Sequence, residues 1–267
     1  IADNKSDKVE AANAAQRLVD KDKVSVVLGS WGSSLSMAAG PIVLDAKVPA
    51  IGLSCTNPLV TLGNDYYFRV CFIDPFQGTV MANYAYTVAG AKTAVIVQEV
   101  SNDYSVGLAK FFTDNFKKLT GNDDCILSVL NYNTGDQDFV GDTWEPPEFI
   151  YVGKKLVEGA TFSTFFAVEG ATSGMSKTFV DAYKAKYSKD PAAVTALGFD
   201  GYLLAIDAIK RADSLDTVKI RDAIAATKGF EAAAGSITLD ENGDATKSAF
   251  IKTVKDGKFT YLTVVAP

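Results

Sequence analysis

The segments that decide the fold of this chain are SVVLGS (25–30), SLSMAAGPIVLDAK (34–47) and VPAIGLS (48–54). The first and third are short apolar runs, which is typical of strands buried in a sheet. The middle segment predicts a helix, which we expect Pro41 to interrupt because proline lacks an amide donor. The order strand, helix, strand predicts a parallel sheet covered by helices.

The same alternation continues along the chain. Pro75 stands at a helical first turn and Gly121 at a helix end, where each residue type is favoured. The C-terminal part is rich in β-type residues, with turns at ENGD (241–244) and KDGK (255–258). The further expected strands are 65–73, 92–100 and 124–133, and the expected helices are 7–21, 75–89, 105–121, 177–190, 195–212 and 218–229. The chain is therefore predicted to belong to the α/β class.

Composition favours binding over catalysis. The 267 residues include no histidine, which removes the commonest general base and the commonest metal ligand. The chain has no GxGxxG, GxxxxGK[ST] or GxSxG motif, and DENGD (240–244) lacks the spacing of a calcium-binding loop. A net charge of −6 without a basic cluster argues against nucleic acid. We expect no enzyme activity, cofactor or metal ion.

The three cysteines lack the CxxC spacing of zinc ribbons and thioredoxin-like sites. Cys55 and Cys71 flank one loop and would form a disulfide if the protein is exported, whereas three small buried thiols are the alternative. The sequence leaves both possibilities open.

Two places are unusual for an intact domain. The chain opens at Ile1, without an initiator Met and without a first strand and helix. Near Phe139, TGDQD leads directly to GDTW (141–144), which leaves no room for the helix and strand expected there. Because a βαβ unit takes about 30 residues or more, we expect a whole unit to be absent and the natural protein to be longer.

Polar residues follow two of the predicted strands. Ser33 begins a helix, where free N–H groups favour an anion, although a plain N-cap is the alternative. The Thr56 hydroxyl and the Ser54 carbonyl can bind a carboxylate and an ammonium group, whereas a simple turn before Pro58 is equally compatible with the local sequence.

Several segments in a fixed order carry a family resemblance: GSWGSSLSMA (29–38), IGLSCTNP (51–58), FRVCFIDPFQG (68–78), SNDYSVGLA (101–109), GDTW (141–144) and ALGFDGY (196–202). With them the chain resembles the Leu/Ile/Val-binding family, the extracytoplasmic amino-acid-binding proteins of ABC importers. The resemblance implies two hinged, Rossmann-like lobes with parallel sheets flanked by helices, the type I periplasmic-binding fold. Lobe 1 would hold residues 1–73 plus 166–249 and lobe 2 residues 74–165 plus 250–267, with the ligand cleft between them.

The resemblance also implies roles for single residues. Ser33 and Thr56 would bind the ligand carboxylate, and Ser54 with Asp142 would bind its ammonium group. Tyr104 would cover the ligand from the second lobe. The alternatives are a helix cap for Asp142 and a loop tyrosine packed on its own helix for Tyr104.

Three further residues are weaker candidates. Trp31 and Trp144 are the only tryptophans and would wall the side-chain pocket, with simple packing as the alternative. Asp200 is a cleft candidate for which a helix-surface or hinge role is equally compatible.

The resemblance implies a monomeric solute-binding component that delivers a small amino acid, of branched-chain type or an analogue, to a membrane permease. It would act on the periplasmic or extracellular face of the cytoplasmic membrane, in free or lipid-anchored form. A ligand-sensing module of the same fold in a receptor or regulator is the alternative. The sequence does not decide which amino acid is bound.

Overall fold

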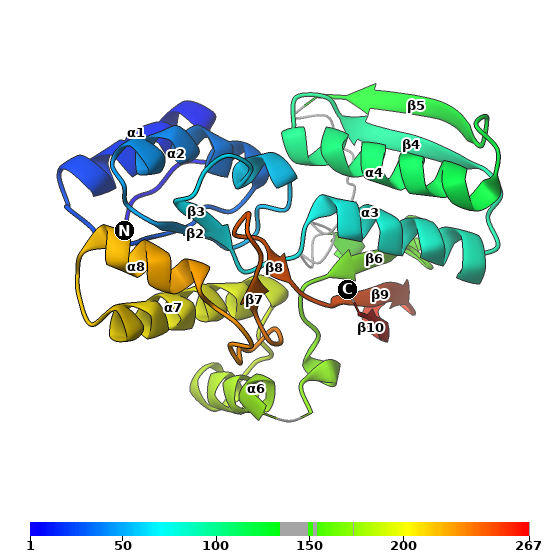
Figure 1. The fold of residues 1–267 in the computed structure, drawn as a ribbon. Coiled ribbons are helices and arrows are strands. Elements are labelled where there is room, and N and C mark those ends of the chain that lie inside the picture. The colour runs from blue at the N-terminus through cyan, green and yellow to red at the C-terminus, as the bar shows by residue number, and fades with distance from the viewer. Residues whose placement is uncertain (134–148, 152–153, 173, 267) are drawn as a thin grey trace. The chain divides into compact units, whose positions relative to one another are not determined.

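The computed structural model describes residues 1–133, 149–151, 154–172 and 174–266, which divide into two compact units. Unit 1 comprises Ile1–Ile73 and Val168–Lys247, and unit 2 comprises Asp74–Ala167 and Ser248–Pro267. Each unit is therefore built from two separate stretches of sequence, and the chain passes between the units three times (Figure 1).

A parallel three-stranded sheet forms the centre of unit 1, in the order β1-β2-β3. The strands are β1 (Val27–Leu28), β2 (Ala50–Gly52) and β3 (Tyr67–Arg69). Ala50 in the middle strand pairs with Val27 on one side and with Tyr67 on the other. All residues of β2 and β3 are buried, as the apolar runs predict for a covered parallel sheet.

Two groups of helices lie on either side of this sheet in Figure 1. One group is α1 (Lys8–Asp20) and α2 (Ser33–Asp45), and the other is α7 (Ala193–Ala212) and α8 (Thr217–Ala225). Gly201 allows α7 to approach the sheet closely, because a Cβ atom there would lie 2.5 Å from Leu53 Cδ2. Unit 1 also contains α6 (Gly174–Tyr187) and a hairpin of β7 (Thr238–Leu239) and β8 (Ala245–Thr246) at the predicted ENGD turn.

Pro41 does not interrupt the second helix, so that prediction is wrong. Helix α2 runs from Ser33 to Asp45 with Pro41 inside it, and it buries Ala39, Gly40 and Val43. Val43 joins a core cluster with Ala50, Cys55, Val60 and Tyr67. Tertiary packing of an apolar helix face contributes more than one missing hydrogen bond, which explains why the helix continues.

The described residues of unit 2 form two sheets. Strands β4 (Ala94–Glu99) and β5 (Ile126–Tyr132) pair in parallel, whereas β6 (Thr161–Thr164), β9 (Ala249–Lys255) and β10 (Lys258–Val265) form an antiparallel sheet in the order β10-β9-β6. The helices are α3 (Asp74–Asn83), which continues as a π-helical turn over Tyr84–Val88, and α4 (Asp103–Thr120), which ends at the predicted Gly121 in the left-handed conformation.

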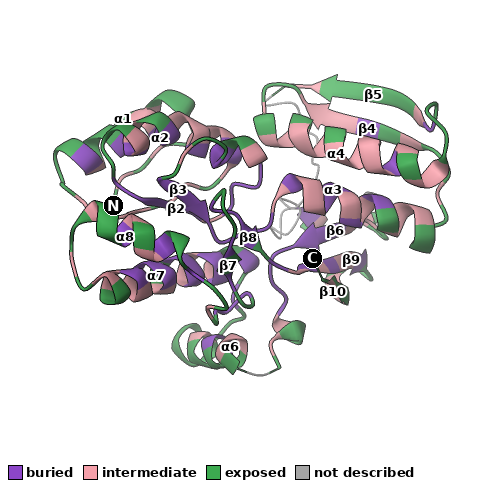
Figure 2. Cartoon of the chain, in the orientation of Figure 1, coloured by how far each residue is buried: buried purple, intermediate pink, exposed green. Residues whose placement is uncertain are grey.

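The parallel pair β4–β5 carries exposed apolar side chains. Leu127, Val129 and Leu130 on β5 are 49–65% exposed, and Val95 on β4 is 51% exposed. Figure 2 draws most of β5 in green, the colour of exposed residues. Parallel sheets are normally covered on both faces, and their strands are then buried throughout. The described part of unit 2 therefore leaves uncovered an apolar surface that a complete α/β layer would bury.

Close packing of α3 against α4 gives a stability prediction. A Cβ atom at Gly78 would lie 2.7 Å from Phe111 Cβ and 2.8 Å from its carbonyl carbon. We expect Gly78→Ala to lower the melting temperature, because overpacking costs about 1–3 kcal/mol and outweighs the roughly 1 kcal/mol that alanine gains in a helix.

Gly198 in α7 provides the matched control, since a Cβ atom there would meet no atom within 4 Å. Gly198→Ala should raise the free energy of unfolding by about 1 kcal/mol, as measured by denaturant titration. Equal effects of the two substitutions would contradict the close α3–α4 contact.

Candidate functional site

The carboxyl ends of the parallel strands bring two loops of unit 1 together. Gly32, in the loop after β1, donates its N–H to the Ser54 carbonyl in the loop after β2 at 2.7 Å. Trp31 and Ser54 also form an isolated parallel bridge. In open α/β sheets this edge is where ligands bind, so the two loops are a candidate site.

Ser33 joins the same two loops through its side chain. Its hydroxyl oxygen accepts a hydrogen bond of 3.1 Å from the Asn57 N–H, and the residue is 2% exposed. The N-cap of α2 is Gly32, which has no side chain to cap the helix, so the interpretation of Ser33 as a plain N-cap is wrong. The start of α2 is therefore available to an anion, which helix N-termini favour.

Thr56 directly precedes Asn57, whose N–H is bonded to the Ser33 hydroxyl. Thr56 is a polar residue that is only 2% exposed. The Ser54 carbonyl already accepts from Gly32 and has a second lone pair left for another donor. The Asn57 side chain accepts from the Leu59 N–H at 2.9 Å and thus supports the turn that begins at Pro58.

Arg69 fixes the loop that carries Thr56. Its guanidinium, which is fully buried, donates to the Cys55 carbonyl, to the Asn57 carbonyl at 3.0 Å and to the Thr61 hydroxyl at 2.7 Å. Arg69 Nε also lies 2.7 Å from Asp244 Oδ1. The loop is thus held on a buried ion pair rather than by its own turn alone.

Asp244 reaches Arg69 because the turn between β7 and β8 packs on β3. The Arg69 N–H donates to the Gly243 carbonyl at 3.0 Å, and Asp244 accepts from the Thr61 hydroxyl at 2.7 Å. Burial raises the pKa of the Asp244 carboxyl, and the charge of Arg69 opposes this rise. Sequence reasoning missed this pair, although an arginine inside a buried strand is a signal that an acidic partner must exist.

Asp200 is not positioned as a ligand contact. It is fully buried, and its carboxylate accepts from the Ala233 and Ala234 N–H groups at 2.6 and 3.0 Å and lies 3.3 Å from Lys247 Nζ. Burial raises the pKa of its carboxyl, and the charge of Lys247 opposes the rise. A helix-surface role is also wrong, because the carboxylate instead ties α7 to the segment that follows α8.

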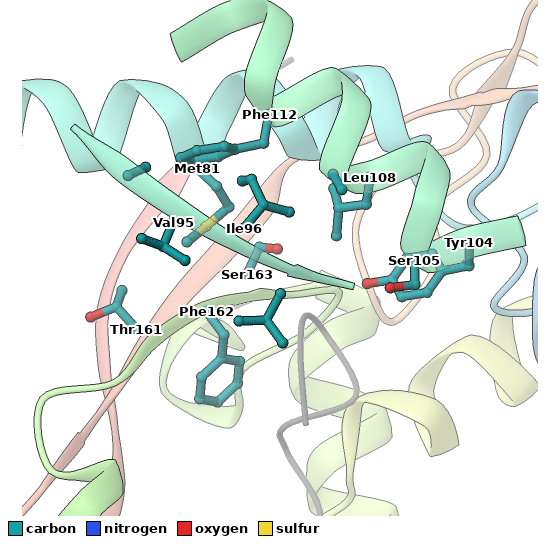
Figure 3. A pocket seen from close by; sticks show the side chains of 13 residues that line it. Met81, Val95, Ile96, Tyr104, Ser105, Leu108, Phe112, Thr161, Phe162 and Ser163 are labelled. Atoms are coloured by element: carbon teal, nitrogen blue, oxygen red, sulfur yellow. The ribbon is translucent and has the colours of Figure 1, made fainter. Parts of the chain in front are cut away.

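The remaining predicted residues lie in different surroundings. Trp31 is 47% exposed beside Ser54. Tyr104 is half-buried in the first turn of α4, not in a loop, and lines a largely apolar pocket of about 230 Å³ in unit 2 (Figure 3). The other walls of this pocket come from α3, β4 and β6. Asp142 and Trp144 lie outside the described residues, so their roles stay predictions.

The described residues show neither a metal-binding cluster nor a membrane-spanning helix. These residues contain no group of three or more acidic or cysteine side chains placed to hold a metal ion. Over the same residues, no helix combines the length and apolar character that crossing a membrane requires.

A family comparison identifies the type of protein. A family model described as periplasmic binding protein matches residues 1–142 and 127–258. The chain belongs to the periplasmic binding protein family. The two matched ranges overlap at 127–142.

Solved structures agree over nearly the whole chain. The leucine-binding protein LivK from Thermotoga maritima superposes with a TM-score of 0.93 at 40% identity, over 99% of this chain and 86% of that one. LivJ from Streptococcus pneumoniae, solved with isoleucine, gives a TM-score of 0.90 at 29% identity with the same coverages. The fold is therefore the type I periplasmic-binding fold, as the sequence predicts.

Curated relatives match different lengths. An amino acid binding protein of Pseudomonas aeruginosa is 34% identical over 139 residues, and the glutamate receptor 2.2 of Arabidopsis thaliana is 30% identical over 139 residues. The chain covers only 36% and 15% of these two proteins. A Leu/Ile/Val-binding protein homolog of Brucella melitensis is 24% identical over 309 positions, more than the 267 residues of this chain, so that relative carries positions that this chain lacks.

The Arg69–Asp244 pair gives a second stability prediction. Asp244→Asn should lower the free energy of unfolding by about 3–5 kcal/mol, because it leaves a buried guanidinium without a counter-charge. Asp181→Asn breaks an exposed pair with Lys177 and should change it by less than about 1 kcal/mol. Urea titration of both variants measures the difference, and equal losses would contradict the importance of the buried pair.

Proposed function

We propose that this chain is the solute-binding component of an ABC importer and that it binds a branched-chain amino acid. The supporting observation in the structure is the pairing in unit 1 of an uncapped α2 start with the nearly buried Thr56 hydroxyl beside it. The similarity to LivK and LivJ supports the class of ligand. The family has the fold of substrate-binding proteins and not of known enzymes.

The polar groups of these loops match the two ends of an amino acid. The start of α2, with the Ser33 and Thr56 hydroxyls, offers donors for a carboxylate. The free lone pair of the Ser54 carbonyl offers an acceptor for an ammonium group. A desolvated ammonium needs a full counter-charge, a role we assign to Asp142 because of the family resemblance.

Apolar contacts would select the side chain. The exposed Trp31 lies next to Ser54, where an aromatic ring can pack against an aliphatic group. The family resemblance assigns Tyr104 of unit 2 to the same ligand after closure of two lobes. We propose that the two compact units are those lobes.

The same reasoning gives the location and the partner. Periplasmic binding proteins act outside the cytoplasm, and those of ABC importers deliver ligand to a membrane permease, so we propose both for this chain. A ligand-sensing module is the second candidate, because the plant glutamate receptor 2.2 shares this sequence pattern over 139 residues. Ligand uptake into vesicles that contain the cognate permease would separate transport from sensing.

Ligand binding is the first measurement. In a thermal-shift panel of the twenty amino acids, leucine, isoleucine or valine should stabilise the protein, by about 2.7 kcal/mol at 100 times the dissociation constant. Isothermal titration should then show one-to-one binding without consumption of the ligand. A shift with sugars or aromatic acids alone would contradict the proposed amino-acid ligand.

The Thr56 hydroxyl provides the residue-level prediction. Thr56→Val should weaken binding by about 1–3 kcal/mol, or roughly 5- to 150-fold, because a buried hydrogen bond to the ligand carboxylate is lost. Thr246→Val is the control, because Thr246 is exposed on β8, where valine is well tolerated. Unchanged affinity in the folded Thr56→Val protein would remove Thr56 from the site.

A further inference from the structure

Cys55 and Cys71 lie together at the carboxyl ends of two neighbouring strands. Strands β2 and β3 pair in parallel, and the Val70 N–H extends this pairing by donating to the Gly52 carbonyl at 3.1 Å. Just beyond, the Cys55 N–H donates to Cys71 Sγ at 3.4 Å. Both cysteines are fully buried, and each is a free thiol.

The two thiol side chains also interact. A hydrogen bond from the Cys71 thiol lowers the pKa of Cys55, and burial raises the pKa of Cys71. Gly52 provides the space for this arrangement, because a Cβ atom at that position would lie 2.2 Å from Cys55 Sγ. The Cys55 sulfur therefore occupies space that the missing side chain of Gly52 leaves open.

We propose that Cys55 and Cys71 form a disulfide under oxidising conditions and that this bond fixes the loop carrying Ser54 and Thr56. With oxidised glutathione as oxidant, each protein thiol loses one proton and one electron, one S–S bond forms, and two molecules of glutathione thiol are released. The extracytoplasmic location in which disulfides persist rests on the proposed function. The bond itself can be tested without any ligand.

The position of the bond gives it a consequence for the site. Cys55 and Cys71 are 16 positions apart, and the loop between them includes the segment that Arg69 holds through the Cys55 and Asn57 carbonyls. Cys71 stands two residues before Ile73, where the chain leaves unit 1 for unit 2. The disulfide would therefore tie the candidate ligand loop to the first connection between the units.

Cys125 provides a matched control. It is equally buried and free, but it belongs to a separate core cluster of unit 2 with Ala82 and Phe116. If oxidation depended only on burial or on the number of thiols, all three cysteines would be oxidised to the same extent. Oxidation that depends on proximity would involve Cys55 and Cys71 and leave Cys125 reduced.

The test is oxidative refolding of the full chain. Denatured protein is refolded with reduced and oxidised glutathione, unfolded again, alkylated without reductant and measured by intact mass and peptide mapping. We expect one alkylated thiol of the three, at Cys125, and a cross-linked peptide pair containing Cys55 and Cys71. Cys125→Ala should show no alkylated thiol and the same cross-link.

Several outcomes would overturn the proposal. These are three alkylated thiols in the refolded wild-type protein, a mixed disulfide with glutathione at Cys55 or Cys71, or a cross-link that includes Cys125. If Cys55→Ala or Cys71→Ala fails to fold, the number of alkylated thiols in the wild-type protein still tests whether the disulfide forms. The oxidised protein should melt at a higher temperature than the same protein after dithiothreitol, and the melting of a Cys55→Ala/Cys71→Ala double variant should not respond to dithiothreitol.

Ligand titration of the oxidised and reduced proteins separates this proposal from the proposed function. If the protein binds leucine but all three thiols are alkylated after refolding, the disulfide proposal is wrong and the proposed binding function stands. If the disulfide forms but no amino acid binds, the thiol chemistry stands and the ligand assignment is wrong. We expect the oxidised form to bind leucine at least as tightly, because its loop loses less freedom on binding.

Discussion

The buried ion pair between Arg69 and Asp244 is the interaction on which the candidate site depends. Arg69 lies inside a fully buried strand, where an unpaired guanidinium would cost several kcal/mol. Its other N–H groups donate to the Cys55 and Asn57 carbonyls and to the Thr61 hydroxyl. The guanidinium whose charge Asp244 neutralises therefore also fixes the path of the 55–61 loop. The turn before β8, whose Asp244 lies 183 positions after Thr61, must dock on β3 for this loop to be formed.

This arrangement explains how a short loop can be a precise site without secondary structure of its own. Ser33 on α2 binds the Asn57 N–H, Arg69 binds the Asn57 carbonyl, and Gly32 binds the Ser54 carbonyl. Three neighbouring elements thus fix the backbone on both sides of Thr56. A hydroxyl held in this way loses little freedom when a ligand binds, which is the physical meaning of a pre-organised site.

Unit 2 differs from this picture, because its parallel pair β4–β5 leaves apolar side chains uncovered. A parallel sheet is normally covered on both faces, so the exposed Leu127 and Val129 mark a surface that a further layer would bury.

The sequence by itself determined the element order, the parallel sheet of unit 1 and the helix end at Gly121, because apolar periodicity and turn residues act over short distances. The resemblance of its ordered motifs indicated the family. The sequence also singled out Ser33, Ser54 and Thr56 as candidate site residues, because they follow strands of the parallel sheet. Only the tertiary structure decided that α2 continues through Pro41 and that Asp200 is buried against Lys247. It alone showed that Arg69 pairs with Asp244 and that Cys55 contacts Cys71. These outcomes depend on contacts between residues far apart in the chain, and local sequence carries no information about such distances.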